Sequence, residues 1–185
     1  MAGSFEHPQR HPAVPPIDRA EITEALFRFA AGINLHDRGL LESVLAPDAT
    51  VDFTSPAHRL GVALPVFEGR HTVADAVMAA NERMDTTHSI SNPRVMEYDG
   101  KHAVLGALVE EHYLPRDGSG RHLVLMNSYQ VDLAVDVSGW TIRRMKIACL
   151  WLSGDPDVLW LPSVNAAKAA GPIDLCAWKD RHRST

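Results

Sequence analysis

The sequence has few of the residues that define disulfide-rich or cysteine-coordinated proteins. Only two cysteines, Cys149 and Cys176, occur among its 185 residues. Two are too few for a disulfide framework or a cysteine-based metal site, and neither lies in a basic cluster that would indicate a reactive thiolate. Residues 1–7 contain no apolar signal region. We therefore expect a cytoplasmic protein from a reducing compartment.

Basic residues are also scarce relative to acidic ones. The chain has 18 Lys and Arg against 23 Asp and Glu, for a formal net charge of −5. The basic residues are scattered, so the basic footprint of a nucleic-acid-binding protein is missing. No apolar run reaches the roughly 18 residues that a membrane-spanning helix requires. We therefore predict neither a nucleic-acid partner nor a membrane partner.

The motifs of common cofactor and nucleophile chemistry are missing as well. There is no G-x-G-x-x-G after a strand, no Walker A loop, no G-x-S-x-G elbow and no H-E-x-x-H. His88, His112 and Glu110 offer two imidazoles and a carboxylate, a set that suits Zn²⁺ or Fe²⁺. Because they lack the helical spacing of known zinc motifs, we expect a site with no metal and no cofactor.

The composition that is present is typical of a globular domain, with 45% hydrophobic and 22% charged residues. Residues 1–16 hold four prolines and no periodic pattern, which predicts a flexible N-terminal arm. We expect one domain over residues 17–155. Residues 156–185 contain Trp160 and Trp178, which indicates a C-terminal tail that packs on the domain or on a neighbouring subunit.

The first half of the chain has helical patterns. Asp18 and Glu21 form a capping box, and apolar residues at helical spacing then predict a helix to about residue 34. Asp37 begins a second, shorter helix, and a third follows residues 72–75. Residues 50–54 alternate like a strand, whereas the stretch 55–69 has the prolines and glycines of a loop.

From Thr87 onward the apolar period changes to two. Strands are predicted over residues 88–98, 101–114, 121–133 and 140–152, with a two-residue hairpin turn at Asp99-Gly100. Four long strands joined by short loops form an antiparallel meander. Helices followed by a twisted antiparallel sheet define an α+β fold. A curved sheet around a helix leaves a cavity in which a small ligand binds.

Several short motifs occur along the chain in the order seen in a known family. They are Ile22-x3-Leu26-x2-Phe29-Ala30, His36-Asp37-x3-Leu41, Ala46-Pro47-Asp48-Ala49-Thr50-Val51-Asp52-Phe53, Thr87-His88-x3-Asn92, Glu111-His112-Tyr113, Gly139-Trp140 and Trp151. Over residues 17–155 the chain resembles the nuclear transport factor 2-like (NTF2-like) superfamily, in its SnoaL-like branch, which includes scytalone dehydratase. The resemblance implies a cone in which a curved antiparallel sheet wraps around an N-terminal helix, with about three helices and an apolar pocket. It also implies a homodimer or homotrimer.

The resemblance further implies the positions of catalytic residues. Enzymes of the family often pair a carboxylate near the end of the first helix with a histidine on the first long strand. His88 matches that histidine, but Asn34 stands at the carboxylate position. In scytalone dehydratase a second pocket histidine matches His112, and a pocket asparagine matches Asn127. Two tyrosines of the dehydratase fall on Ile33 and Phe53.

Further residues are expected to line the pocket. Besides Ile33, Phe53 and Asn127, the expected substrate-binding residues are Phe29, Leu108, Met126 and Trp151. We interpret their side chains as the apolar wall against which a hydrophobic substrate packs.

The chemistry follows from the side chains. His88 titrates near neutral pH and can act as a general base or acid, while Asn34 can fix its tautomer but brings no charge. Glu110 is the candidate for the missing charge because it shares a strand face with His112. The rival is Glu111, on the opposite face with Tyr113. An apolar pocket raises the pKa of a carboxylate inside it.

These residues lead to one main hypothesis and several alternatives. We expect a cofactor-independent lyase, either a dehydratase or a C–C-cleaving enzyme that releases an aldehyde. Its substrate is expected to be a small hydrophobic molecule, aromatic or polycyclic. An isomerase or polyketide-type cyclase with the same pocket is an alternative. A non-catalytic ligand-binding module, or the small subunit of a ring-hydroxylating oxygenase, is another, because this fold hosts many functions.

Overall fold

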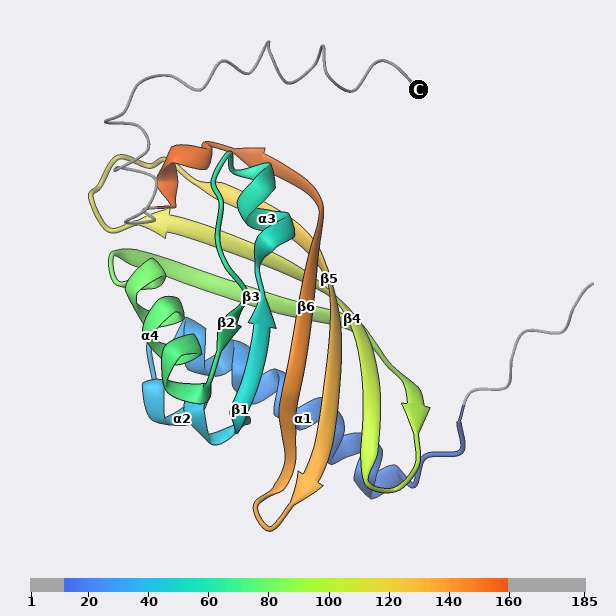
Figure 1. The fold of residues 1–185 in the computed structure, drawn as a ribbon. Coiled ribbons are helices and arrows are strands. Elements are labelled where there is room, and N and C mark those ends of the chain that lie inside the picture. The colour runs from blue at the N-terminus through green and yellow to red at the C-terminus, as the bar shows by residue number, and fades with distance from the viewer. Residues whose placement is uncertain (1–11, 160–185) are drawn as a thin grey trace, which may run out of the picture.

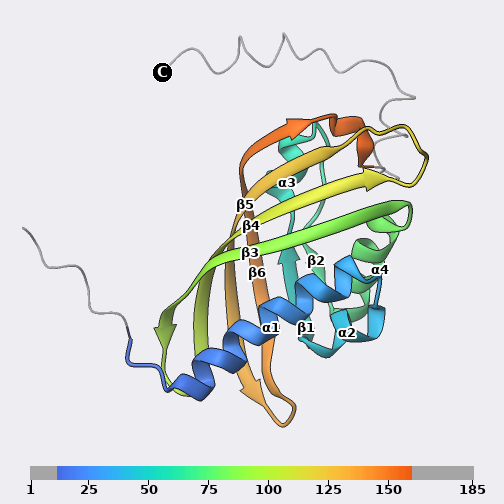
Figure 2. The same cartoon turned by 180° about the vertical axis from the view of Figure 1, so that it is seen from behind.

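A long helix lies along one face of a strongly curved six-stranded sheet in the computed structural model, which describes residues 12–159 (Figures 1 and 2). In chain order the elements are α1 (Pro16–Asn34), α2 (Arg38–Ser43), β1 (Leu45–Asp52), α3 (Thr54–Arg59), β2 (Phe67–Glu68), α4 (Arg70–Asn81), β3 (Met84–Tyr98), β4 (His102–Pro115), β5 (Leu123–Asp136), β6 (Gly139–Gly154) and the 3₁₀-helix η1 (Pro156–Val158). The predicted α+β class and helix-wrapped curved sheet are confirmed.

The sheet has the strand order β2-β1-β6-β5-β4-β3. Strands β3 to β6 form the predicted antiparallel meander. The sheet also contains one parallel pair, β1 with β6, which the sequence did not predict. Strand β1 also begins at Leu45, well before the predicted residue 50. Pro47 has no N–H to donate and lies where the β1–β6 register shifts, so the alternating pattern is interrupted there.

The core lies between α1 and the inner face of the sheet. Ile22, Leu26, Phe29 and Ile33 from α1 are almost completely buried there, and burying each such side chain stabilises the fold by roughly 1.5–3 kcal/mol. Gly32 lets α1 approach α2 closely. A Cβ at that position would lie 2.7 Å from the backbone N of Leu41, so the crossing of these two helices requires glycine.

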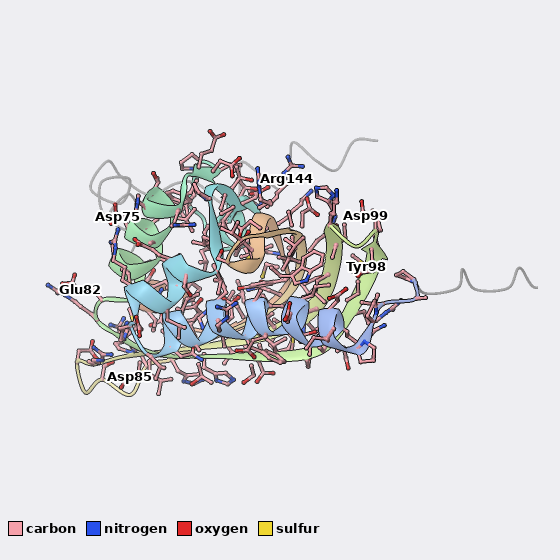
Figure 3. The ribbon with its side chains drawn as sticks, turned by 90° about the horizontal axis from the view of Figure 1, so that it is seen from below. Asp75, Glu82, Asp85, Tyr98, Asp99 and Arg144 are labelled. Atoms are coloured by element: carbon pink, nitrogen blue, oxygen red, sulfur yellow. The ribbon has the colours of Figure 1, made fainter. Side chains whose placement is uncertain are left out.

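The ends of the first two helices differ in how they are capped. Asp37 caps α2 as predicted, because its Oδ1 accepts a hydrogen bond from Leu40 N at 2.9 Å. The predicted cap at Asp18 is wrong, since α1 begins earlier, at Pro16. Proline favours the first helical position, where its fixed φ suits the helix and its missing N–H is not needed. The Asp18 carboxylate instead accepts a hydrogen bond from Tyr98, the last residue of β3, which Figure 3 labels.

The segment predicted as a loop over residues 55–69 contains the short helix α3 and the two-residue strand β2. Asp52 Oδ1 accepts hydrogen bonds from the backbone N and the hydroxyl of Thr54, at 2.9 and 2.6 Å. These bonds stabilise the start of α3, where Pro56 sits in the first turn. The helix covers one side of the cavity described below.

The connections between the long strands also differ in length from expectation. The β3–β4 connection spans residues 99–101 rather than two residues. Asp99 Oδ1 accepts hydrogen bonds from Lys101 N and His102 N, at 2.8 and 2.7 Å, and Gly100 has a φ of 90°. This carboxylate therefore organises the wider turn.

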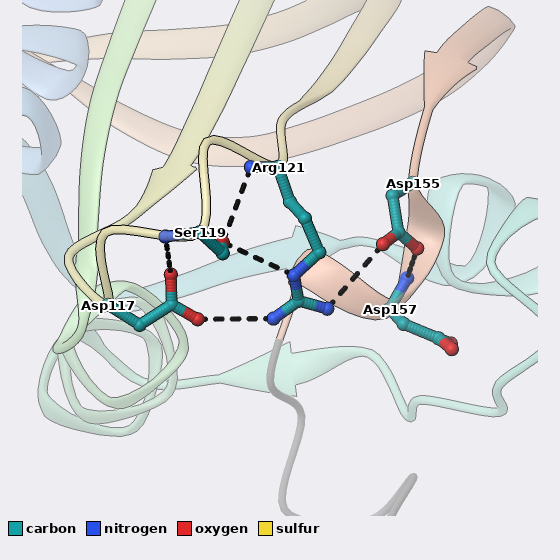
Figure 4. A network of polar contacts seen from close by, with 5 residues as sticks. All are labelled: Asp117, Ser119, Arg121, Asp155 and Asp157. Atoms are coloured by element: carbon teal, nitrogen blue, oxygen red, sulfur yellow. Dashed lines mark hydrogen bonds and ion pairs between the residues drawn. The ribbon is translucent and has the colours of Figure 1, made fainter.

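A polar network fastens η1 to the β4–β5 turn (Figure 4). Arg121 contacts Asp117 at 3.2 Å and Asp155 at 3.5 Å. Asp155 in turn accepts a hydrogen bond from Asp157 N at 2.9 Å. Just beyond it, Val158 is buried in a small apolar cluster that Leu159 joins. The network thus holds the end of the described chain against the sheet.

The arm and the tail proposed from the sequence fall mainly outside the described residues. The structure does not describe residues 1–11 or residues 160–185, which include Trp160 and Trp178. The proposed domain boundaries therefore stay predictions. Between residues 12 and 159, no helix combines the length and apolar character needed to cross a membrane.

Candidate active site

A cavity of about 380 Å³ lies against the inner face of the sheet, beside α3 and α4. Most of its lining is apolar and comes from helices, strands and loops, including Phe53, Ala57, Leu60, Val77 and Leu159. Six lining residues are polar: Asn81, His88, Glu111, Tyr113, Asn127 and Tyr129. All six are buried, so their interactions take place in an environment of low dielectric constant.

The strand register brings five of these polar residues together. His88 on β3 pairs directly with Glu111 on β4. Glu111 and Tyr113 share one face of β4, because alternate residues of a strand point the same way. Asn127 and Tyr129 on β5 share the same face of the sheet and contact Glu111. Three adjacent strands therefore position one polar cluster inside an otherwise apolar cavity.

Asn34 fixes the orientation of His88. Its Oδ1 accepts two hydrogen bonds, from His88 N and from His88 Nδ1, each at 2.9 Å. Because a backbone N–H can only donate, the Asn34 atom must be the oxygen, and His88 Nδ1 must carry its hydrogen. The Nε2 atom of the neutral ring is then left with a free lone pair. Burial lowers the pKa of His88, and the negative charge of Glu111 opposes that effect.

Glu111 is a buried carboxylate held by three donors. Tyr113 donates to Oε2, and both Tyr129 and Asn127 Nδ2 donate to Oε1, each at 2.6 Å. Glu111 is only 4% exposed, so these bonds replace the solvent that its charge loses on burial. Its Oε2 lies 4.0 Å from His88 Nε2. The base nitrogen of the histidine and the carboxylate therefore face each other.

Burial and the charge of Glu111 raise the pKa of both tyrosines, Tyr113 and Tyr129, well above 10. Both phenols consequently keep their hydrogens at neutral pH and remain donors. They serve as permanent supports of the carboxylate.

The placement predicted for Glu110 and His112 is wrong. Both lie on the outer face of β4, where their side chains are 41% and 40% exposed and contact each other at 2.7 Å. On this strand the odd-numbered residues face inward, from Ala103 to Tyr113. The expectation reversed that order because it used the resemblance to place His112 inside. Glu111, the rival, supplies the carboxylate instead.

The remaining predicted site residues divide into two groups. Ile33, Phe53 and Asn127 line the cavity as expected, and Asn34 contacts His88. Phe29 is buried in the core, outside the residues that line the cavity. Leu108 and Met126 alternate with the inward-facing residues of β4 and β5 and so lie on the outer face.

Trp151 also lies outside the cavity, and a bulge explains why. Met126 pairs with Trp151 whereas the next residue, Asn127, pairs with Cys149. Leu150 is therefore an extra residue in β6, and the alternation of its side chains is interrupted there. Leu150 and Trp151 are both exposed, at 47% and 46%.

Sequence reasoning did not identify Asn81, Tyr113 and Tyr129 as site residues. The signal for the two tyrosines is their shared parity with Glu111 and Asn127 on adjacent strands. Asn81 gives no such signal, because a polar residue at a helix end is ordinary. Within residues 12–159 we find no group of three His, Cys, Asp or Glu side chains arranged to hold a metal ion.

The curved sheet, the long helix across it and the cavity beside α3 and α4 define an α+β protein of the NTF2-like class. Residues 17–146 match the SnoaL-like domain family. The match covers more than half of the chain, and the protein belongs to this family. A curated relative is the "Terrestric acid biosynthesis cluster protein E" of Penicillium crustosum. The two are 26% identical over 144 residues, which cover 75% of this chain and 86% of that protein.

Solved structures share the fold at low sequence identity. The Kfla4162 protein of Kribbella flavida has a TM-score of 0.68 at 23% identity, covering 77% of this chain and 96% of that one. A proposed scytalone dehydratase of Novosphingobium aromaticivorans has a TM-score of 0.65 at 12% identity, covering 75% and 88%. A hexachlorocyclohexane dehydrochlorinase of Novosphingobium barchaimii has a TM-score of 0.61 at 15% identity, covering 80% and 99%.

Proposed function

We propose that this protein is a cofactor-independent lyase that acts by proton transfer through His88. Its substrate is a small, largely apolar molecule, aromatic or polycyclic, from which it removes water or an aldehyde fragment. The observation that carries the proposal is the juxtaposition of His88 Nε2 with the Glu111 carboxylate, 4.0 Å apart, in an apolar cavity. Such a pairing of a base with a buried charge is typical of acid–base sites.

In a dehydration, His88 Nε2 takes the proton from a substrate carbon. The electron pair of that C–H bond forms the new double bond, and the neighbouring C–O bond breaks. The resulting imidazolium returns the proton to the departing hydroxyl, which leaves as water, so the histidine ends neutral.

Glu111 stabilises the imidazolium that forms during this step. Two opposite charges 4 Å apart interact with an energy of about 4 kcal/mol at an effective dielectric constant near 20. The three donors hold the carboxylate in a fixed position beside the ring. Asn34 holds the ring in the required tautomer throughout, but it supplies no charge. In this account, the basicity of His88 depends on Glu111.

The comparisons support elimination chemistry. The dehydrochlorinase and the proposed scytalone dehydratase are both named for reactions that eliminate a small molecule. The relative from P. crustosum is named for a biosynthesis cluster, which is compatible with a small organic substrate.

An isomerase or cyclase would use the same groups but return the proton to a carbon of the substrate. A non-catalytic module would bind a ligand in the same cavity. Burying a carboxylate and a histidine in an apolar cavity costs stability. We favour an enzyme over a module because catalysis gives a reason to retain both groups. A homodimer or homotrimer, and a cytoplasmic location, remain part of the proposal.

Incubation in D₂O with a panel of hydroxylated aromatic and polycyclic compounds tests the proposal. Mass spectrometry would follow both the loss of water or aldehyde and the entry of deuterium at carbon. A lyase is expected to release the small product from at least one compound. Deuterium at carbon with no change in composition would indicate the isomerase, and binding with neither change would refute an enzyme.

A further inference from the structure

We propose that this cavity selects neutral ligands by their hydrogen-bond donors, and that Asn81 is a specificity-determining residue at its α4 side. The ligand would carry hydroxyl or N–H groups on an apolar skeleton and would not be an anion. The inference deepens the proposed function by naming the ligand class of the same cavity. It concerns binding alone and does not require turnover.

The hydroxyl and imidazole N–H groups of the cavity already donate hydrogen bonds within the protein. The hydroxyls of Tyr113 and Tyr129 both donate to Glu111, and His88 Nδ1 donates to Asn34. The nitrogen of Asn127 also donates to Glu111. A ligand carbonyl or carboxylate that enters this end therefore meets engaged donors, apart from the second amide hydrogens of Asn127 and Asn81.

The acceptors, by contrast, retain free capacity. Neutral His88 has a lone pair on Nε2. Glu111 Oε2 accepts a hydrogen bond from Tyr113 alone among the described residues, and a carboxylate oxygen can accept two. Asn127 Oδ1 is buried and receives no hydrogen bond from residues 12–159. The polar end of the cavity is thus rich in acceptors, which a ligand with O–H or N–H groups would complement.

Asn81 presents a further acceptor. It is the last residue of α4 and is 6% exposed. Its Nδ2 donates to Val77 O, one turn earlier, at 2.8 Å, and this bond fixes which end of the amide is the oxygen. Asn81 Oδ1 is buried and receives no hydrogen bond from the described chain. A buried acceptor without a partner is unfavourable, so a ligand donor that reached it would bind more tightly.

The charge of the cavity excludes anions. Glu111 is buried, and none of the described lining residues is Lys or Arg. Burial lowers the pKa of His88, so the ring does not neutralise Glu111 at neutral pH. A ligand carboxylate would therefore bring a second negative charge into an apolar site beside the first, with no cation to compensate.

Binding of three matched naphthalenes at neutral pH tests the inference: a naphthalenediol, the corresponding dimethoxynaphthalene and a naphthalenecarboxylate. Isothermal titration calorimetry on the full chain measures each affinity. We expect the diol to bind at least about tenfold more tightly than the dimethoxy compound and the carboxylate to bind weakest. Equal affinity of diol and dimethoxy compound, or tightest binding of the carboxylate, would overturn the inference.

The substitution Asn81→Leu tests the specific role of Asn81. It removes the acceptor, and we expect the diol to bind about tenfold more weakly while binding of the dimethoxy compound is unchanged or tighter. If Asn81 had a purely structural role, the variant would bind both compounds more weakly by the same factor. That result would overturn the assignment. Asn81→Ala removes the same oxygen if the leucine variant does not fold. Met78→Leu, a volume-conserving change on the same helix outside the cavity lining, is the control.

The two proposals fail separately. A protein that prefers the diol but shows no deuterium exchange and releases no product would refute the lyase and retain the binding inference. A protein that turns over a compound without donors would refute the inference and retain the lyase.

Discussion

Asn34 and His88 are joined by two hydrogen bonds to a single atom, because Asn34 Oδ1 accepts from both the backbone N and the Nδ1 of His88 at 2.9 Å. This pairing fixes the tautomer and leaves Nε2 as the base. It supplies no negative charge, so Glu111 on the other side of the ring becomes the electrostatic partner.

Removing the imidazole of His88 should abolish proton transfer. We expect His88→Ala to lower kcat/KM by about 10²–10⁴-fold, the usual contribution of a general base. His112→Ala is the matched control, since His112 lies on the outer face of the sheet, and its activity should stay near that of the wild type. Steady-state kinetics on both folded variants measure the difference. Similar losses in the two variants would contradict the site.

Glu111→Gln should impair catalysis while keeping most of the local hydrogen bonds. The remaining oxygen can still accept from Asn127 and Tyr129, and the new amide nitrogen can donate to Tyr113 if that hydroxyl turns. Without the charge, the imidazolium is less stable, and we expect kcat/KM to fall about 10- to 1,000-fold. Glu110→Gln, on the outer face, should have little effect. A larger loss in Glu110→Gln than in Glu111→Gln would count against this account.

Asn34→Asp should raise the pKa of His88. The aspartate keeps both hydrogen bonds but adds a negative charge beside Nδ1, which favours the imidazolium. The acid limb of the pH–rate profile should therefore move to higher pH than in the wild type. Histidine titration by NMR gives an independent reading of the same pKa. An acid limb that does not move would show that position 34 has no electrostatic influence on the base.

The wild-type activity should persist below the usual pKa of histidine. Burial lowers the pKa of His88, so Nε2 stays unprotonated at pH values where a free histidine, with a pKa near 6.5, is charged. We expect kcat/KM to be lost only as the pH falls through this lowered pKa. A profile whose acid limb lies above the usual histidine value would be the contrary result.

The same lowered pKa predicts how stability depends on pH. Below about pH 6.5 the unfolded chain takes up a proton on this histidine before the folded chain does. The contribution of His88 to the free energy of unfolding is therefore complete above that pH. It is lost as the pH falls toward the pKa of His88 in the folded protein. Urea unfolding of wild type and His88→Asn over this range measures the contribution, which should disappear in the variant.

Gly32→Ala should destabilise the fold through the α1–α2 crossing. The new Cβ would lie within 3 Å of the Leu41 backbone, which cannot move as a side chain can, and we expect a loss of about 1–3 kcal/mol. Gly39→Ala in α2 is the control, because its Cβ would meet only Asp37 Oδ1 at 3.4 Å. Urea unfolding of the two variants should separate them clearly.

The sequence predicted the strands of the meander well, because period-two alternation over long strands is a strong local signal. It predicted α1 by its apolar stripe, but not its exact start, because Pro16 and Asp18 both suit a helix N-terminus. It did not predict α3 or the parallel β1–β6 pair. Those features depend on contacts distant in the sequence, such as the pairing of Val51 with Met145.

The candidate site was only partly predictable for a related reason. His88 and Asn34 follow from the family resemblance. The choice between Glu110 and Glu111 depends on strand parity, and β4 has apolar residues on both faces, as Val104 and Leu105 show. The outward position of Trp151 depends on a bulge, which alternation cannot reveal. Partners such as Tyr129 become visible only once the strands are placed in register.

A crystal structure of the chain soaked with hydroxylated aromatic and polycyclic compounds tests the central claim most directly. We predict a compound in the cavity with a carbon or hydroxyl within about 3 Å of His88 Nε2, close to Glu111 and away from the exposed pair of Glu110 and His112. A compound bound only on the outer face of the sheet would contradict it. So would a cavity compound that leaves His88 without contact.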